Sequence, residues 1–141
     1  MLHMPLMVTN LPALLAANPS VDWRAIRLGS DQARSGIDCN GMAHDAAVPL
    51  LMAYQRLVCI LPPTEDHRAI PLLESGLHSA IQIASLPQHQ FERHWASLFP
   101  GEEALGLRVY RAALSRRSAL LHRHMNELQR NEPHYRAARF K

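Results

Sequence analysis

The sequence has little of what specifies β-structure. Val, Ile, Thr and the aromatic residues do not form alternating runs, and only 6% of the residues are aromatic. Strands are usually built from such runs, so a sheet protein is disfavoured. Ten prolines against six glycines suit many short helices instead. Because 48% of the 141 residues are hydrophobic and 19% are charged, the chain can bury the core of one domain. We therefore predict a compact, all-α single domain of five to seven helices.

Cysteine is also scarce. Cys39 and Cys59 are the only two, and neither a CxxC pair nor a zinc-ligand spacing occurs. Cys59 falls within an apolar helical pattern and is predicted to be a buried thiol. A single disulfide between the two cysteines stays open at this point.

The motifs of common enzymes are missing. The sequence contains no GxSxG, SxxK, P-loop, GxGxxG or HExxH pattern. Its nine histidines are scattered: His89 and His94 are five apart, whereas His122 and His124 are two apart. Neither spacing places two imidazoles on one side of a helix, as a shared metal would need. We predict a non-enzymatic protein with no metal and no cofactor, while an enzyme activity stays open.

Long apolar segments are absent, so no membrane span is predicted. The N-terminal stretch MLHMPLMVTNLPALLAANP has no Lys or Arg before its apolar part, and Pro5 and Pro12 interrupt that part. A cleaved signal peptide is therefore not expected. The predicted location is the bacterial cytoplasm, or the exterior by a route that needs no cleaved signal peptide.

Apolar periodicity divides the chain 1–141 into three parts. These are a less regular N-terminal part (1–44), a helical core (45–130) and a tail (131–141). In the N-terminal part, short helices are predicted after the capping residues Asn10 and Ser20. The segment 29–41, rich in Gly, Ser, Asp and Asn, is predicted to be a mobile loop.

The helical core is predicted to hold the two longest helices, over 45–61 and 102–130. Thr64 is predicted to cap a helix between them, which Pro71 should kink or shorten. Pro49 is expected in the first turn of the earlier long helix, or to displace its start. The later helix has one apolar stripe at spacings of three, four and seven: Leu107, Tyr110, Leu114, Leu121, Met125 and Leu128.

The stretch 71–95, here called the hub, is predicted to organise the rest of the chain as a helix-turn-helix-like unit. Gly76 should end a helix in the left-handed conformation, and Leu77 should fold back on that helix as in a Schellman cap. Ser79 can cap the next helix, and proline at position 87 suits the start of a third. The structural residues of the hub are Leu73, Gly76, Leu77, Phe91 and Trp95.

The charge of the chain is uneven. Residues 102–141 carry nine Arg or Lys and four Glu, a net charge of +5, whereas the remainder carries −2. Such asymmetry is typical of a surface for nucleic acid or for an acidic partner, and it can equally let a basic helix dock on an acidic body. The predicted partner-binding residues are Arg108, Arg111, Arg116, Arg117 and Arg123.

Three stretches in this order resemble one family: LLMAYQRLVCILPP (50–63), LLESGLHSAIQIASLPQHQF (72–91) and EEALGLRVYRAALSRR (102–117). They are similar to a helical segment in the A components of bacterial insecticidal toxin complexes, the Tc toxins, and in related virulence-plasmid proteins. The resemblance covers about residues 45–120. The family's A components are much longer chains, and Pro87 stands where a capping Ser or Thr would be usual.

The resemblance implies an α-helical, toxin-related module, without the pore formation, pentamerisation or receptor binding of the complete A components. The resulting hypothesis is a protein-interaction or assembly module that serves a larger toxin or secretion complex. Its partners would be proteins, such as a neighbouring subunit. The alternative is a nucleic-acid-binding domain, because the hub also resembles a helix-hairpin-helix turn followed by an Arg-rich helix.

Overall fold

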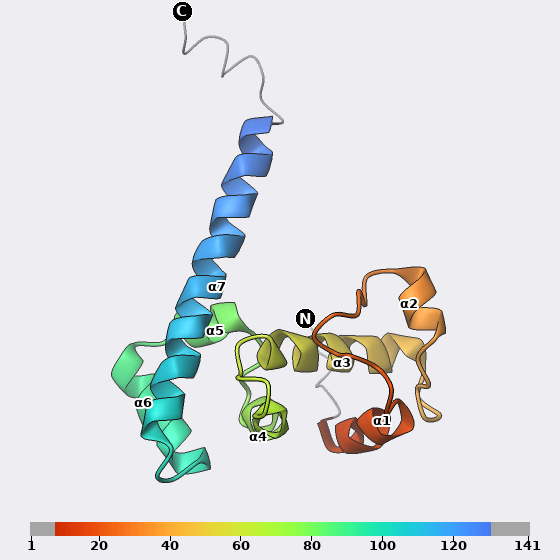
Figure 1. Ribbon diagram of the computed structural model, residues 1–141, viewed down its shortest axis with the longest axis horizontal. Helices are drawn as coiled ribbons and strands as arrows, with labels where there is room; N and C mark the ends of the chain where they lie inside the picture. Colours follow the sequence, from red (N-terminus) through yellow and green to blue (C-terminus); the bar gives the residue numbers. More distant parts are fainter. Residues whose placement is uncertain (1–7, 131–141) are drawn as a thin grey trace, which may run out of the picture.

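A computed structural model describes residues 8–130 of the chain (Figure 1). That part forms seven α-helices, two short 3-10 helices and no strand, so the all-α prediction is confirmed. The α-helices are α1 (Leu11–Ala17), α2 (Asp31–Ser35), α3 (His44–Val58), α4 (Ala69–Glu74), α5 (Ala80–Ala84), α6 (Gln88–Leu98) and α7 (Glu103–Arg130). The 3-10 helices are Val8–Asn10 and Asp66–Arg68. The predicted tail lies outside the described residues.

The central element is α3 (Figure 1). Eight of its fifteen residues are buried, and α1 and α4 pack against it. Pro49 is its sixth residue rather than a member of its first turn, which corrects the prediction. A proline in the helix interior removes one backbone hydrogen bond. Here the carbonyl that loses its donor is that of Asp45, and Asp45 is exposed to solvent.

Within the N-terminal part, a polar side chain joins segments twenty residues apart. Asn18 is the buried end of α1, and its amide nitrogen donates to the carbonyls of Leu14 (2.9 Å) and Asp38 (2.8 Å). Its amide oxygen accepts from the backbone N–H of Asp38 (2.8 Å). A buried amide with all these bonds made specifies one path for the chain. The less regular part is therefore held in place over residues 18–38.

Three local predictions in the first half of the chain are wrong. The helix expected after Ser20 is a single turn, because Gln55 of α3 donates to the carbonyls of Trp23 (2.9 Å) and Ile26 (2.5 Å). The expected loop 29–41 contains α2, which the side chain of Ser30 caps.

Thr64 caps no helix, since the chain enters α4 through the 3-10 helix that begins at Asp66. The six residues of α4 agree with the expected shortening by Pro71, its third residue.

The remaining helices form a group beside α3 (Figure 1). Both α5 and α6 pack against the first turns of α7, while the C-terminal half of α7 projects away from the body of the molecule. The buried apolar residues, from Leu11 of α1 to Ala113 of α7, form one continuous cluster. This continuity fits one domain, and the division into 1–44, 45–130 and 131–141 stays a prediction.

Candidate functional site

The hub turn has the predicted Schellman geometry. Gly76 has φ +97°, and its N–H donates to the carbonyl of Leu73 (3.0 Å). The N–H of Leu77 donates to the carbonyl of Leu72 (3.0 Å), which completes the cap. Leu73 and Leu77 are both buried. The prediction for this turn is therefore confirmed.

A side chain that sequence reasoning overlooked also braces the turn. Gln82 donates to the carbonyl of Gly76 (2.8 Å), and its side-chain oxygen accepts from the N–H of His78 (2.8 Å). Its own N–H donates to the hydroxyl of Ser79 (3.1 Å), the predicted cap of α5. The amides of residues 76, 77 and 78 thus all have internal partners. They are not directed at an external phosphate, as a helix-hairpin-helix contact would require.

Phe91 and Trp95 lie in the core on one face of α6, as predicted. The indole N–H of Trp95 donates to the carbonyl of Glu102 (2.8 Å), just before α7. The ring of Tyr110 lies 5.5 Å from that of Phe91, and its hydroxyl donates to a backbone carbonyl after α5 (2.6 Å). The aromatic residues therefore hold α5, α6 and α7 together.

Sequence reasoning missed the closest contact between α6 and α7, which is at Gly106. A Cβ at this position would lie 2.6 Å from Cδ1 of Trp95, so α7 approaches the indole only because the residue is glycine. The signal was a lone glycine inside a long helical pattern, which often marks a close approach.

The two halves of α7 differ in burial. Gly106, Val109, Tyr110 and Ala113 are buried, so the packed face is offset from the predicted leucine stripe and shares with it only the buried Tyr110 and the partly buried Leu114. In the C-terminal half, residues 121–130 are all exposed. They include Leu121 (57% exposed), Met125 (59%) and Leu128 (49%). These three residues, here called the apolar row, share one face of the helix because they are four and three apart.

The five arginines predicted to bind a partner do not converge on one site. Arg117 is half-buried and donates to the carbonyl of Ala84 in α5 (3.2 Å), so its observed contact is internal. The other four are exposed along α7: Arg108, Arg111, Arg116 and Arg123. Arg116 alone of the five also lines a cavity in the described part of the chain.

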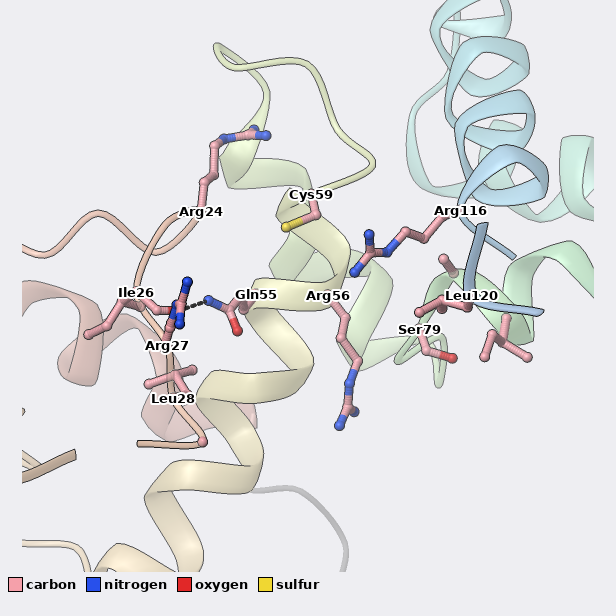
Figure 2. Close-up of a pocket in the computed structure, with 13 residues that line it drawn as sticks. Arg24, Ile26, Arg27, Leu28, Gln55, Arg56, Cys59, Ser79, Arg116 and Leu120 are labelled. Carbon is pink, nitrogen blue, oxygen red and sulfur yellow. Dashed lines mark hydrogen bonds between the residues drawn. The ribbon is translucent and has the colours of Figure 1, made fainter. Parts of the chain in front are cut away.

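This cavity, here called the arginine groove, has a volume of about 740 Å³ and opens between segments that are distant in the sequence. Figure 2 shows residues 24–28 on one side, the end of α3 in the middle, and Ser79 and α7 on the other side. Four arginines line it: Arg24, Arg27, Arg56 and Arg116. None of its thirteen lining residues is acidic.

Only one groove arginine has a carboxylate partner among residues 8–130. Arg24 is paired with Asp66 and also donates to the carbonyl of Pro62 (3.1 Å). Arg27, Arg56 and Arg116 are exposed and have neither an ion pair nor a side-chain hydrogen bond within the described part of the chain. The groove therefore carries three uncompensated positive charges.

The structure corrects the prediction for Cys59 and shows the environment of Cys39. Cys59 ends α3 and is exposed in the arginine groove, which corrects its prediction as a buried thiol; α3 stops at Val58, so the apolar pattern does not extend over it. Cys39 is the buried one. Burial raises the pKa of the Cys39 thiol, and the neighbouring Asp38 carboxylate raises it further. The two thiols are not bonded to each other.

Metal-ligating residues do not cluster within residues 8–130. No group of three or more His, Cys, Asp or Glu side chains there could hold a metal ion. His94 lies 2.8 Å from the hydroxyl of Ser75, but that hydroxyl donates to the carbonyl of Leu72 (2.7 Å). This serine therefore closes the C-terminal end of α4.

Within the same residues, no helix combines the length and the apolar character that crossing a bilayer would take. Comparison of the chain with protein-family models, curated proteins and solved structures gave no match.

Proposed function

We propose that this protein is a non-enzymatic interaction module that docks a partner protein on the projecting half of α7. The apolar row carries the proposal, because three large apolar side chains are exposed on one helix face. Rows at this spacing are typical of helices that bind another helix or a groove. The body of the molecule packs against the first half of α7. The exposed residues 121–130 of the second half, here called the arm, are therefore accessible to a partner.

The charge of the projecting half indicates the kind of partner. Residues 116–130 carry four arginines, of which three are exposed, and one carboxylate, that of Glu127. Two copies of the chain pairing along the row would bring these like charges together, which opposes self-association. An acidic amphipathic helix of a different protein would satisfy both the apolar row and the charge.

We further propose that this partner belongs to a larger toxin or secretion complex. The support is the resemblance to Tc-toxin A components, whose three matching stretches form α3, the run from α4 to α6, and the packed half of α7. The protein would act in the bacterial cytoplasm, or leave the cell without a cleaved signal peptide.

The test compares two double variants of equal charge. Leu121→Glu with Leu128→Glu removes the apolar row, whereas Asn126→Glu with Gln129→Glu places the same charges on other exposed positions of the same turns. Pull-downs with the purified products of neighbouring genes should lose the partner only for the first variant. Equal capture by both variants would contradict the proposal.

Mass photometry of the purified protein alone gives a second outcome. A dimer that only the leucine variant breaks would assign the row to a second copy of the chain, and would overturn the proposal of a different partner. A monomer, combined with selective loss in the pull-down, supports it.

A nucleic-acid-binding function is a second candidate, favoured by one observation. Arg116, Arg123 and Arg130 recur every seven residues, so they lie along one exposed side of α7. Phosphate contacts would come from these side chains and not from the hub turn, whose amides are engaged. Gel shifts should then weaken with salt by a log–log slope of about 0.9 per contact. Arg116→Glu with Arg123→Glu should abolish the shift, and a shift that ignores salt would exclude this function.

A further inference from the structure

The arginine groove is separate from the apolar row and presents different chemistry. Figure 2 shows Arg116 reaching from α7 across the groove toward the end of α3, where Arg56 and Cys59 lie. A cation at the end of a helix is favoured by the helix dipole. Arg27 and Arg56, however, add two further charges without a carboxylate near any of the three in the described structure. A concave surface with one sign of charge concentrates ions of the opposite sign.

The walls of the groove are not polar throughout. Ile26, Leu28 and Ala80 line it, together with Leu120 of α7 and Ile81, whose side chain is 50% exposed. Apolar side chains beneath a rim of guanidinium groups match a ligand that carries both an apolar group and carboxylates. A purely ionic ligand would leave these apolar walls in contact with water.

The groove lacks the marks of a site for a small, compact anion. Such sites hold their ligand with a few precisely placed polar groups. Here the only buried polar residue in the described part of the chain is Asn18, which serves α1 elsewhere. The three free guanidinium groups come from three separate segments and are exposed, so their charge surrounds the groove without meeting at one point.

We propose that the arginine groove binds an acidic peptide segment, in which carboxylates flank a bulky apolar side chain. The apolar side chain packs against Ile81 and Leu120, and the carboxylates pair with Arg27, Arg56 and Arg116. The proposal rests on the proposed function in one respect, namely that the segment belongs to a partner protein. It adds a second contact, next to the arm, that selects acidic partners.

The primary measurement is fluorescence anisotropy with short labelled probe peptides and the full-length protein. The first probe has glutamates around a leucine, the second has glutamine for every glutamate, and the third has serine for the leucine. We expect the second probe to bind at least roughly tenfold more weakly than the first, since each charge-assisted contact contributes about that factor or more. The third should also bind several-fold more weakly.

Charge-reversal variants then locate the binding. Arg56→Glu and Arg116→Glu should each weaken binding of the first probe by roughly tenfold or more. Arg111→Glu is the matched control, because Arg111 is exposed on α7 and does not line the groove. It should change binding by less than about twofold. The replaced side chains have no partners in the described structure, so circular dichroism should show every variant folded.

Cys59 supplies an independent readout that needs no arginine variant. Its exposed thiol lies in the groove, whereas Cys39 is buried with a raised pKa, so iodoacetamide should modify Cys59 first. The bound first probe should slow this reaction, and the glutamine probe should not. Unchanged alkylation at saturating probe would place the binding elsewhere and overturn the proposal.

Other outcomes decide between the remaining readings. Equal binding of the glutamate and glutamine probes would overturn the groove proposal. A loss of binding in Arg111→Glu equal to that in Arg56→Glu and Arg116→Glu would also overturn it. Displacement of the probe by millimolar inorganic phosphate would show a simple anion site and would also overturn it. The leucine variant of the arm should bind the probe normally. If it does while partner capture is unaffected by that variant, the docking proposal fails and the groove proposal stands.

Discussion

The two halves of α7 share one helix and one kind of apolar repeat, yet only one half is packed. In the N-terminal half, the buried residues Gly106, Val109 and Ala113 are small or medium-sized and lie against α5 and α6. In the C-terminal half, larger side chains such as Leu121 and Leu128 are exposed. Tyr110 is also buried in the N-terminal half, so periodicity identifies a helix, but contacts with distant segments decide which face is packed. The uncovered half is the part available to a partner.

The largest expected difference between the halves concerns a glycine. Gly106→Val should lower the free energy of unfolding by about 3 kcal/mol, because its Cβ would overlap the Trp95 ring. The indole has no room to move, since it is 1% exposed and bonded to Glu102. Ser118→Val, on the exposed side of the other half, should change stability by less than about 0.5 kcal/mol. Urea unfolding of both variants measures the contrast, and equal effects would mean that α7 is not packed on Trp95.

A second pair compares apolar truncations. Val109→Ala removes two buried methyl groups and should cost about 2 kcal/mol, including the cavity that remains. Leu121→Ala removes more carbon atoms, but from an exposed position, and should cost less than about 0.5 kcal/mol. Thermal unfolding of the two variants should show a clear drop in melting temperature only for the first. A large loss in Leu121→Ala would show that the row is already covered in solution.

The hub turn supports the packed half, and its glycine tests that support. Nothing lies within 4 Å of a Cβ built at Gly76, so the cost of Gly76→Ala is backbone strain alone, about 1 kcal/mol. Gly76→Val should cost more, since a β-branched residue tolerates positive φ poorly. Gly29→Ala is the control, because it also has open space but no positive φ.

We expect the Gly76 variants to lose partner binding in step with their melting temperature, because the turn positions helices and is not itself a contact. A variant that melts normally but no longer binds would make the turn part of the interface.

The smallest effect concerns an ion pair that anchors the entry to the packed half. Arg68 donates to the carboxylate of Glu65 (2.5 Å) and lies over the ring of Phe99 (4.8 Å). The hydrogen bond from Arg68 is the main cause that lowers the pKa of Glu65. A lowered pKa means that the pair stabilises the fold above the pKa of the unfolded chain, and that this contribution is lost as the pH falls through the folded value.

Glu65→Gln should therefore lower the melting temperature slightly at about pH 7 and by less at about pH 3. Glu127→Gln in the projecting half is the control, since Glu127 is exposed and has no ion pair within residues 8–130. It should have no effect at either pH. A loss at pH 3 equal to that at pH 7 would show that charge is not the cause.

Local chemistry made much of the second half of the chain predictable. A glycine followed by an apolar residue specifies a Schellman cap, and Ser79 marks the next helix start, since both signals act within a few residues. The same reasoning failed near Trp23 and at Thr64, where Gln55 and Asp66 bring contacts from distant parts of the sequence. Local propensity is a weak guide where tertiary hydrogen bonds compete for the backbone.

The sequence by itself determined the all-α class, the hub with its cap, the Phe91–Trp95 face and the start of the last helix, because periodicity and capping are properties of neighbouring residues. Only the tertiary structure decided which face of α7 is packed and whether Cys59 is buried or exposed. It alone placed Arg27, Arg56 and Arg116 around one groove. Burial and the convergence of charges depend on segments far apart in the chain, and one-dimensional spacing carries no measure of that distance.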